Sequence, residues 1–236
     1  MVLVPGMLCD AALWDGVRPA LTGLAGPLVD VLPDAPDIAG MARQVLDAVE
    51  GPFVLVGLSL GAIVGFEVVR RAPQRVAAFA ALSTNAAAPT RAQLAAWREA
   101  DQAAAEGRFA SVVEQTLATM FAEPRPAPAL DQAYRDMARR VGPERLRAQL
   151  AAQATRTDAL PALAAYPGPT LVLCGGRDAL CPPSYHVAIA TAAPRARLRQ
   201  LPTAGHLLPV EQPGATAEAL GDWLAGVLPQ PPPADR

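Results

Sequence analysis

Gly57-Leu58-Ser59-Leu60-Gly61 is the stretch that decides the fold of this 236-residue chain. The apolar run Phe53–Val56 precedes it, and a run of helix-forming residues, Ala62–Arg71, follows it. Where a buried strand turns sharply into a helix, small residues on both sides of the turn let neighbouring backbone pass without a Cβ clash. The pattern therefore predicts that Ser59 stands at the exposed tip of a tight strand-to-helix turn.

Ser59 is a candidate nucleophile because of this context. From the glycine and serine frequencies, a chance G-x-S-x-G match is expected only about 0.02 times in a chain of this length. A serine hydroxyl is a weak nucleophile at neutral pH, and it reacts only beside a base and beside donors for a developing oxyanion. The alternative is a serine in a turn without chemistry, and residues further along the chain decide between the two interpretations.

Length and composition exclude several classes of protein. The chain fits one large domain, or one domain with a modest insertion. Its hydrophobic fraction of 52% and charged fraction of 18% are typical of a compact globular protein. Every basic residue is arginine, which indicates a bias of the coding sequence rather than a function. The formal net charge of −2 gives no electrostatic reason to expect a nucleic acid or an anionic membrane as partner.

No targeting or cross-linking signal stands out in the sequence. No apolar run approaches the length of a membrane span, and the amino terminus lacks a basic stretch followed by a signal-peptide core. The three cysteines, Cys9, Cys174 and Cys181, are odd in number and lack metal-ligand spacing. We therefore expect small buried or half-buried thiols, no disulfide framework, no metal site and a cytoplasmic location.

Short apolar runs alternate with amphipathic segments through most of the chain. This alternation is typical of an α/β protein whose mostly parallel central sheet carries helices on both faces. We expect strands at Val2–Val4, Leu28–Leu32, Phe53–Val56, Ala77–Leu82, Thr170–Leu173 and Ala196–Leu201. We expect helices near Ala11–Leu21, Ile38–Val49, Ala62–Arg71, Ser184–Ala192 and Ala215–Val227.

The alternation stops between residues 86 and 166, where helix-favouring sequence is broken at Pro124–Pro128 and at Gly142-Pro143. We expect a helical lid here, above the crevice where open α/β sheets bind ligands. The alternative is extra helices packed elsewhere on the sheet. The expected domains are a core of residues 1–85 and 167–228, the lid of residues 86–166, and a frayed C-terminal tail of residues 229–236.

The chain has two histidines as candidate bases for Ser59. His206 is favoured, because it follows the last expected strand, where a loop can carry a side chain over the sheet edge. His186 falls within the expected helix Ser184–Ala192, and we expect it to be a surface or half-buried structural histidine.

A catalytic imidazole needs a carboxylate to hold its tautomer, and Asp178 suits this role. It follows the expected strand Thr170–Leu173, so it lies at the same sheet edge as the other two residues. A rival acid after the preceding strand would fall near Ser83–Ala88, but this stretch has no carboxylate. The resulting chain order is Ser59, Asp178, His206, which differs from the orders of chymotrypsin and subtilisin.

Two backbone amides are candidates for an oxyanion hole. One donor normally comes from the residue after the nucleophile, here Leu60, and the other from the loop after the first strand, here Met7. The alternative for the Met7 loop is a simple strand-ending turn. Trp97, Phe109 and four further large side chains of the lid are candidates for walls of a substrate pocket, and we name four as the pocket: Met120, Phe121, Tyr134 and Met137.

These residues together resemble the α/β-hydrolase superfamily, and specifically its small lid-bearing bacterial members. Four blocks that span the chain outside the lid carry the likeness: VLVPGMLCDAALWD, FVLVGLSLGAIVGFEVVRRAPQRV, PTLVLCGGRDALCPP and LPTAGHLLPVEQP. The resemblance implies a sheet of the eight-stranded type that begins here at its third strand, with a lid before the strand preceding the acid. It also implies a Ser-Asp-His triad, hydrolysis through an acyl-enzyme and the same two oxyanion donors. Many relatives have His-Gly where this chain has Pro5-Gly6, a departure that bears on the geometry of that loop.

The leading hypothesis is a carboxylesterase-like serine hydrolase for a small, mostly apolar carboxylic ester, with no cofactor. The alternatives are a thioesterase, or a C–C bond hydrolase or lyase that acts on a carboxylated metabolite clamped by lid arginines. A non-catalytic small-molecule receptor is a third hypothesis. Residues 86–166 contain ten arginines and nine acidic residues, a balance that does not demand a strongly anionic substrate.

Overall fold

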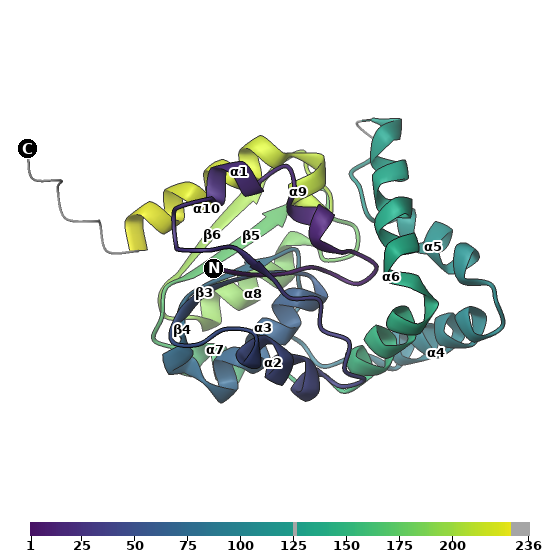
Figure 1. Cartoon of the computed structure of the whole chain (residues 1–236), viewed down its shortest axis with the longest axis horizontal. Helices are drawn as coiled ribbons and strands as arrows, with labels where there is room; N and C mark the ends of the chain where they lie inside the picture. The colour runs from purple at the N-terminus through teal and green to yellow at the C-terminus, as the bar shows by residue number, and fades with distance from the viewer. Residues whose placement is uncertain (125–126, 228–236) are drawn as a thin grey trace, which may run out of the picture.

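Six parallel strands form one sheet at the centre of the protein (Figure 1). The computed structural model describes residues 1–124 and 127–227. The sheet order is β2-β1-β3-β4-β5-β6. The strands are β1 (Val2–Val4), β2 (Val29–Asp30), β3 (Phe53–Leu58), β4 (Val76–Leu82), β5 (Thr170–Gly175) and β6 (Ala196–Leu201).

The inner strands are apolar because helices cover both faces of the sheet. All six residues of β3 and all six of β5 are buried. Alternate residues of one strand enter different hydrophobic clusters: Val2 and Val4 pack on one face and Leu3 on the other. The expectation of an α/β fold with a parallel sheet is confirmed, and six strands fit a sheet that begins at the third strand of the eight-stranded type.

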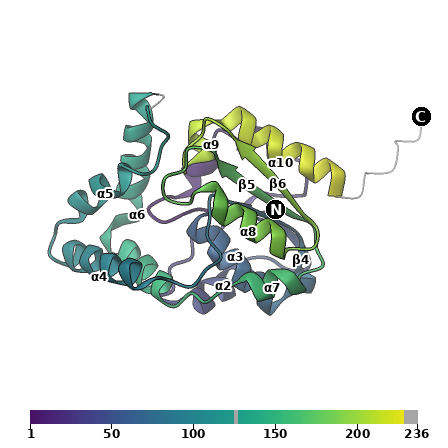
Figure 2. The same cartoon turned by 180° about the vertical axis from the view of Figure 1, so that it is seen from behind.

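Helices and short 3₁₀ segments fill the connections. They are η1 (Ala11–Trp14), α1 (Arg18–Leu21), α2 (Ile38–Asp47), α3 (Leu60–Arg71), η2 (Pro73–Arg75), α4 (Arg91–Ala105), α5 (Phe109–Leu117), α6 (Pro128–Ala154), α7 (Leu160–Ala165), α8 (Pro183–Ala192), α9 (Leu208–Glu211) and α10 (Pro213–Val227). The helices α2, α3, α7 and α8 lie on one face of the sheet, and α1, α9 and α10 lie on the other (Figures 1 and 2). Within the described residues, no helix combines the length and apolarity needed to cross a lipid bilayer.

Two expected elements are shorter in the structure. The single helix expected over Ala11–Leu21 is wrong, because η1 and α1 are separate. A Cβ on the intervening Gly16 would lie 2.7 Å from the Pro213 Cβ, so close packing on α10 takes priority over helix continuity. The strand expected at Leu28–Leu32 contains only Val29–Asp30, since prolines on both sides cannot donate to a ladder.

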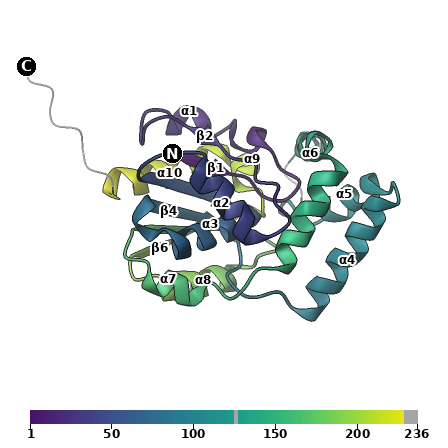
Figure 3. The ribbon, with the colours of Figure 1, turned by 60° about the horizontal axis from the view of Figure 1, so that its bottom comes forward.

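Between β4 and β5 the chain forms α4, α5, α6 and α7. The first three lie together at one end of the sheet (Figure 3), whereas α7 packs against α3 and α8. The expected break at Gly142-Pro143 is a kink inside α6, where Gly142 has a φ of 76° and a ψ of 170°. The expected break at Pro124–Pro128 falls partly, and the expected tail Pro229–Arg236 entirely, outside the described residues.

Candidate active site

Ser59 lies between β3 and α3 with a backbone that few residues adopt. Its φ is 54° and its ψ is −113°, a combination that costs about 1–3 kcal/mol and persists only where surrounding contacts enforce it. The Ser59 amide donates to the Leu82 carbonyl at 2.8 Å, and the Thr84 hydroxyl donates to the Ser59 carbonyl at 3.0 Å. Neighbouring strand β4 therefore holds this turn in its strained form.

The glycines around Ser59 allow backbone segments to approach one another closely. A Cβ on Gly61 would lie 2.1 Å from the Val4 carbonyl oxygen, and a Cβ on Gly57 would lie 2.5 Å from the Gly61 carbonyl carbon. On the other side of the turn, a Cβ on Gly6 would lie 3.3 Å from the Ser59 Cβ. The loop after β1 thus passes directly beside Ser59, as the strand order β1-β3 requires.

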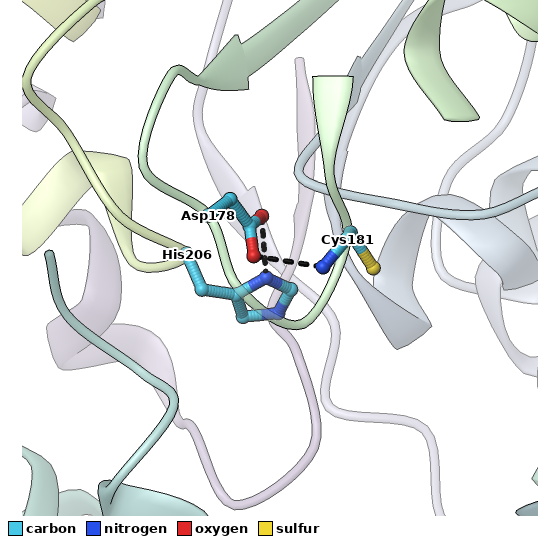
Figure 4. Close-up of side chains that lie close together, drawn as sticks. All are labelled: Asp178, Cys181 and His206. Atoms are coloured by element: carbon cyan, nitrogen blue, oxygen red, sulfur yellow. Dashed lines mark hydrogen bonds and ion pairs between the residues drawn. The ribbon is translucent and has the colours of Figure 1, made fainter. Parts of the chain in front are cut away.

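Asp178 and His206 form a buried hydrogen-bonded pair (Figure 4). The distance from His206 Nδ1 to Asp178 Oδ2 is 2.8 Å, and the two residues are 2% and 3% exposed. The other carboxylate oxygen accepts the backbone amides of Leu180 at 2.9 Å and Cys181 at 2.8 Å. Because a carboxylate only accepts, Nδ1 carries the proton and Nε2 is left as the basic atom.

The loop that carries His206 is fixed to the segment after α5. The backbone amides of His206 and Leu207 both donate to the Met120 carbonyl, at 3.2 and 3.1 Å. Glu211 accepts the Gly205 amide at 2.9 Å and the Ala122 amide at 3.3 Å, and burial raises the pKa of this carboxyl group. The position of the imidazole therefore depends on contacts from the helical segment between β4 and β5.

Ser59 and His206 line one cavity of about 370 Å³ at the carboxyl ends of the strands. Met7, from the loop after β1, also lines it. The helices α4, α5 and α6 close the cavity from the other side. The surface of its wall is mostly apolar, although polar side chains also line it; the aliphatic side chains include Leu58, Ile63, Val112, Leu146, Leu150 and Leu207. The structure thus brings Ser59 and the imidazole of the buried pair to the same cavity.

A sequence model of a known family matches residues 1–219, nearly all of the described chain. That model describes the alpha/beta hydrolase family. The chain belongs to the alpha/beta hydrolase family.

Solved structures of other hydrolases resemble this alpha/beta hydrolase over nearly its whole length. A thermophilic esterase from Thermogutta terrifontis is 27% identical, with a TM-score of 0.87 over 96% of this chain and 89% of the esterase. A hydrolase from Pseudomonas aeruginosa PA01 is also 27% identical, with a TM-score of 0.82 over 94% of this chain and 88% of its own.

A curated relative matches over a shorter stretch. The sn-1-specific diacylglycerol lipase of Mus musculus is 37% identical over 60 residues, which cover 25% of this chain and 20% of the lipase. The match therefore spans much less than two thirds of that relative's length.

The two amides expected to bind an oxyanion lie on either side of the turn in this alpha/beta hydrolase. Leu60 is the first residue of α3, where an amide has no acceptor within its own helix. Met7 lies in the loop that passes Ser59. In the described part of the chain, neither amide has a hydrogen-bond acceptor. Met7 lines the cavity, whereas Leu60 is buried and is not among its lining residues.

The expected pocket residues divide into two pairs. Met120 and Tyr134 line the cavity, and Trp97 does so as well. Phe121 and Met137 belong to the same buried cluster but do not line this cavity, so their place in a substrate pocket stays a prediction. Helical periodicity predicts which residues are buried, but it does not separate those that face a neighbouring helix from those that face a cavity.

The sequence did not predict which polar residues line the cavity. Gln93, Gln153 and Arg156 line the cavity at the end where α4 meets the C-terminal end of α6. The sequence does not single out Arg156 among the lid arginines, because an arginine near an amphipathic helix carries no sequence signal that it points inward.

His186 is fully buried, so the expectation of a surface or half-buried histidine is wrong. Its Nε2 accepts the Thr84 amide at 2.8 Å, and its Nδ1 lies 3.3 Å from the Pro182 carbonyl. Desolvation lowers the pKa of this imidazole to about 4. The role is structural, since His186 connects α8 to Thr84, which holds the Ser59 carbonyl. The buried side of α8 explains the error, because that helix packs against α7 and the sheet.

Asp178, Cys181 and His206 offer potential metal-ligating atoms within 4.8 Å of one another (Figure 4). A metal here would displace the hydrogen bond between Asp178 and His206. Burial and the neighbouring Asp178 raise the pKa of the Cys181 thiol, which disfavours the thiolate that a metal requires. These contacts fit a hydrogen-bonded acid–imidazole pair better than a metal centre.

Proposed function

We propose that this chain is a serine hydrolase that cleaves a small carboxylic ester through an acyl-enzyme. Ser59 is the nucleophile, His206 the general base and Asp178 the residue that orients the base. The observation that carries the proposal is the buried hydrogen bond of 2.8 Å between Asp178 and His206, on the same cavity as the strained Ser59.

The mechanism follows from the proton positions. With Nδ1–H held by Asp178, His206 Nε2 takes the Ser59 proton while Oγ attacks the substrate carbonyl carbon. The imidazolium then protonates the leaving alcohol, and Asp178 stabilises its charge. A water molecule repeats the cycle on the acyl-enzyme: His206 takes its proton, and Ser59 leaves with a proton returned by the imidazolium.

The amides of Met7 and Leu60 would hold the negative oxygen that forms during each attack. Both lack an acceptor among the described residues, which supports this role. A preorganised donor of this kind typically contributes about 3 kcal/mol of transition-state stabilisation. The departure from His-Gly to Pro5-Gly6 leaves the backbone donor at Met7 in place.

The cavity supports a substrate of modest size. A volume of about 370 Å³ with a mostly apolar wall surface suits a short acyl chain or a small alcohol. The esterase and lipase names of the similar proteins agree with an ester bond. A thioester would react by the same steps, so a thioester and the matching oxygen ester should be compared as substrates.

Hydrolysis of p-nitrophenyl acetate, butyrate and octanoate, together with labelling by a fluorophosphonate probe, tests the proposal. We expect turnover of the short esters and a label on Ser59. Ser59→Ala should abolish the label and lower kcat by up to about a million-fold, because the residues of such a unit act together. Ser111→Ala, at an exposed position on α5, is the matched control and should leave both unchanged. A Ser59→Ala variant that loses less than tenfold in kcat would overturn the assignment.

A further inference from the structure

Arg156 is a buried arginine on the wall of the cavity that also contains Ser59 and His206. It follows the C-terminal end of α6 and is only 7% exposed. The backbone around it is fixed on both sides: the Thr155 hydroxyl accepts the Ile38 amide at 3.0 Å, and the Ala159 amide donates to the Ala86 carbonyl at 2.8 Å. The guanidinium is therefore held in place rather than free to swing into solvent.

The partners of this guanidinium are all neutral. One Nη donates to Gln153 Oε1 and the other to Gln93 Oε1, both at 3.1 Å. The guanidinium carbon lies 5.2 Å from the centre of the Trp97 ring. The Nε atom is buried without a hydrogen-bond acceptor, and no carboxylate of the described residues forms an ion pair with Arg156.

Other arginines of α6 behave differently. Arg135, Arg139, Arg140, Arg145 and Arg147 each pair with an aspartate or glutamate at the surface. Arg156 alone among the arginines of residues 135–156 is buried, and it alone lacks such a partner in the described chain. Burial lowers the pKa of its guanidinium, which reflects the cost of keeping a charge there. A buried charge without a counter-charge is costly unless a ligand completes it.

The remainder of the cavity wall carries no permanent charge. The described lining residues include no aspartate, glutamate or second arginine. Burial also raises the pKa values of Cys9, Tyr134 and Cys181, so these groups stay neutral. The cavity thus combines apolar and neutral polar side chains with one positive charge that has no paired carboxylate among the described residues, and Ser59 and His206 also line it.

We propose that the substrate carries a carboxylate that pairs with Arg156 while its ester carbonyl is attacked by Ser59. This inference rests on the proposed function and narrows its small carboxylic ester to one that also carries a carboxylate: a monoester of a dicarboxylic acid, or an ester at the hydroxyl of a hydroxycarboxylic acid. A planar carboxylate matches the donor geometry of a guanidinium, and its single charge matches the single charge of the wall. A phosphate, with nearly two charges at neutral pH, would be left half neutralised.

Matched substrates test the inference in the wild-type protein. The pair p-nitrophenyl hemiglutarate and p-nitrophenyl butyrate places a carboxylate on the acyl side in one member only. The pair 4-carboxyphenyl butyrate and phenyl butyrate places it on the leaving-group side. We expect kcat/KM to favour the carboxylate in one pair by at least tenfold, and the favoured pair tells which part of the substrate meets Arg156. A preference for the neutral member in both pairs would overturn the inference.

Variants at Arg156 assign the preference. Arg156→Met keeps an unbranched apolar stem and removes the guanidinium, so the preference for the carboxylate should fall at least tenfold. The fall in kcat/KM should be much larger for the carboxylate ester than for its neutral partner, whereas loss of a merely structural arginine would lower both values alike. Arg156→Lys keeps the charge without the planar fork and should retain part of the preference. Arg147→Met, on the exposed side of α6 and paired with Asp101, is the matched control and should keep it in full.

A binding measurement separates failure of this inference from failure of the proposed function. Calorimetry with glutarate on Ser59→Ala and on Ser59→Ala/Arg156→Met requires no turnover. We expect at least tenfold weaker binding in the double variant. If esters are hydrolysed at Ser59 and glutarate binds both proteins equally, Arg156 is structural and only this inference fails. If glutarate binding depends on Arg156 but Ser59 neither reacts nor labels, the hydrolase proposal fails while the carboxylate subsite stands.

Discussion

Asp178 uses both of its carboxylate oxygens, and this makes its replacement informative. One oxygen accepts from His206 and the other from the amides of Leu180 and Cys181. In Asp178→Asn the side-chain NH₂ must face a donor on one of these two sides. The imidazole then turns or changes its tautomer, so Nε2 no longer accepts the Ser59 proton. We expect kcat for p-nitrophenyl butyrate to fall about 10⁴-fold, as in other triads that lose this carboxylate.

The control for Asp178→Asn is Cys181→Ala. Cys181 reaches Asp178 through its backbone amide, which this substitution leaves in place. Its kcat should stay within a few-fold of the wild-type value. If Asp178→Asn keeps more than a tenth of the wild-type kcat, the carboxylate does not orient the base.

At the scale of elements, a chain of hydrogen bonds joins helix α8 to the turn at Ser59. His186 on α8 accepts the Thr84 amide, and the Thr84 hydroxyl donates to the Ser59 carbonyl. Only a neutral imidazole can accept at Nε2 while Nδ1–H faces the Pro182 carbonyl. Protonation of His186 would break the first link and place a charge between α8 and β4.

This chain predicts a pH dependence of stability. Folding lowers the pKa of His186 from its ordinary value of 6.5 to about 4, so between these values the unfolded chain binds a proton that the folded chain excludes. The stabilisation, about 3 kcal/mol, is complete above pH 6.5 and is lost as the pH falls towards 4. His186→Gln has no titrating group, although its amide oxygen can accept from Thr84. Urea unfolding measures the free energy of unfolding at pH 7 and at pH 4.5. The decrease between these pH values should be about 2 kcal/mol smaller in the variant than in the wild type. An equal decrease in the free energy of unfolding in the two proteins would contradict the assignment of this pH dependence to His186.

At the scale of the whole molecule, the sequence predicted features that depend on strand order and missed those that depend on packing of the helices. Ser59 directly follows β3, whereas Asp178 and His206 lie in the loops after β5 and β6, and parallel strands end at the same edge. Their proximity to the cavity therefore followed from topology, although their catalytic roles stay a proposal. The positions of Arg156 and His186 follow from how α6 and α8 turn on their axes, which local patterns do not encode. Gly16 likewise acts through its contact with Pro213, which interrupts the expected helix. The prolines beside β2 shorten that strand because they lack an N–H donor.

The segment from α4 to α6 shares its hydrophobic core with the sheet, so the division into core and lid stays a prediction with a consequence for folding. Tyr134 and Leu146 of α6 belong to the same buried cluster as Leu8 and Trp14. The Gln149 side chain accepts the Leu8 amide at 3.1 Å, which adds a polar link between the two parts.

Because these contacts cross the boundary, we expect the buried amides of α6 to open only with the sheet. Hydrogen exchange measured by mass spectrometry should give opening free energies for α6 and for β4 that agree within about 1 kcal/mol. The four-residue helix α1 (Arg18–Leu21), near the edge of the molecule, is the internal control and should exchange much faster. If α6 opens several kcal/mol more easily than β4, the helical segment is an independent lid, and the cavity around Ser59 and Arg156 opens by its release.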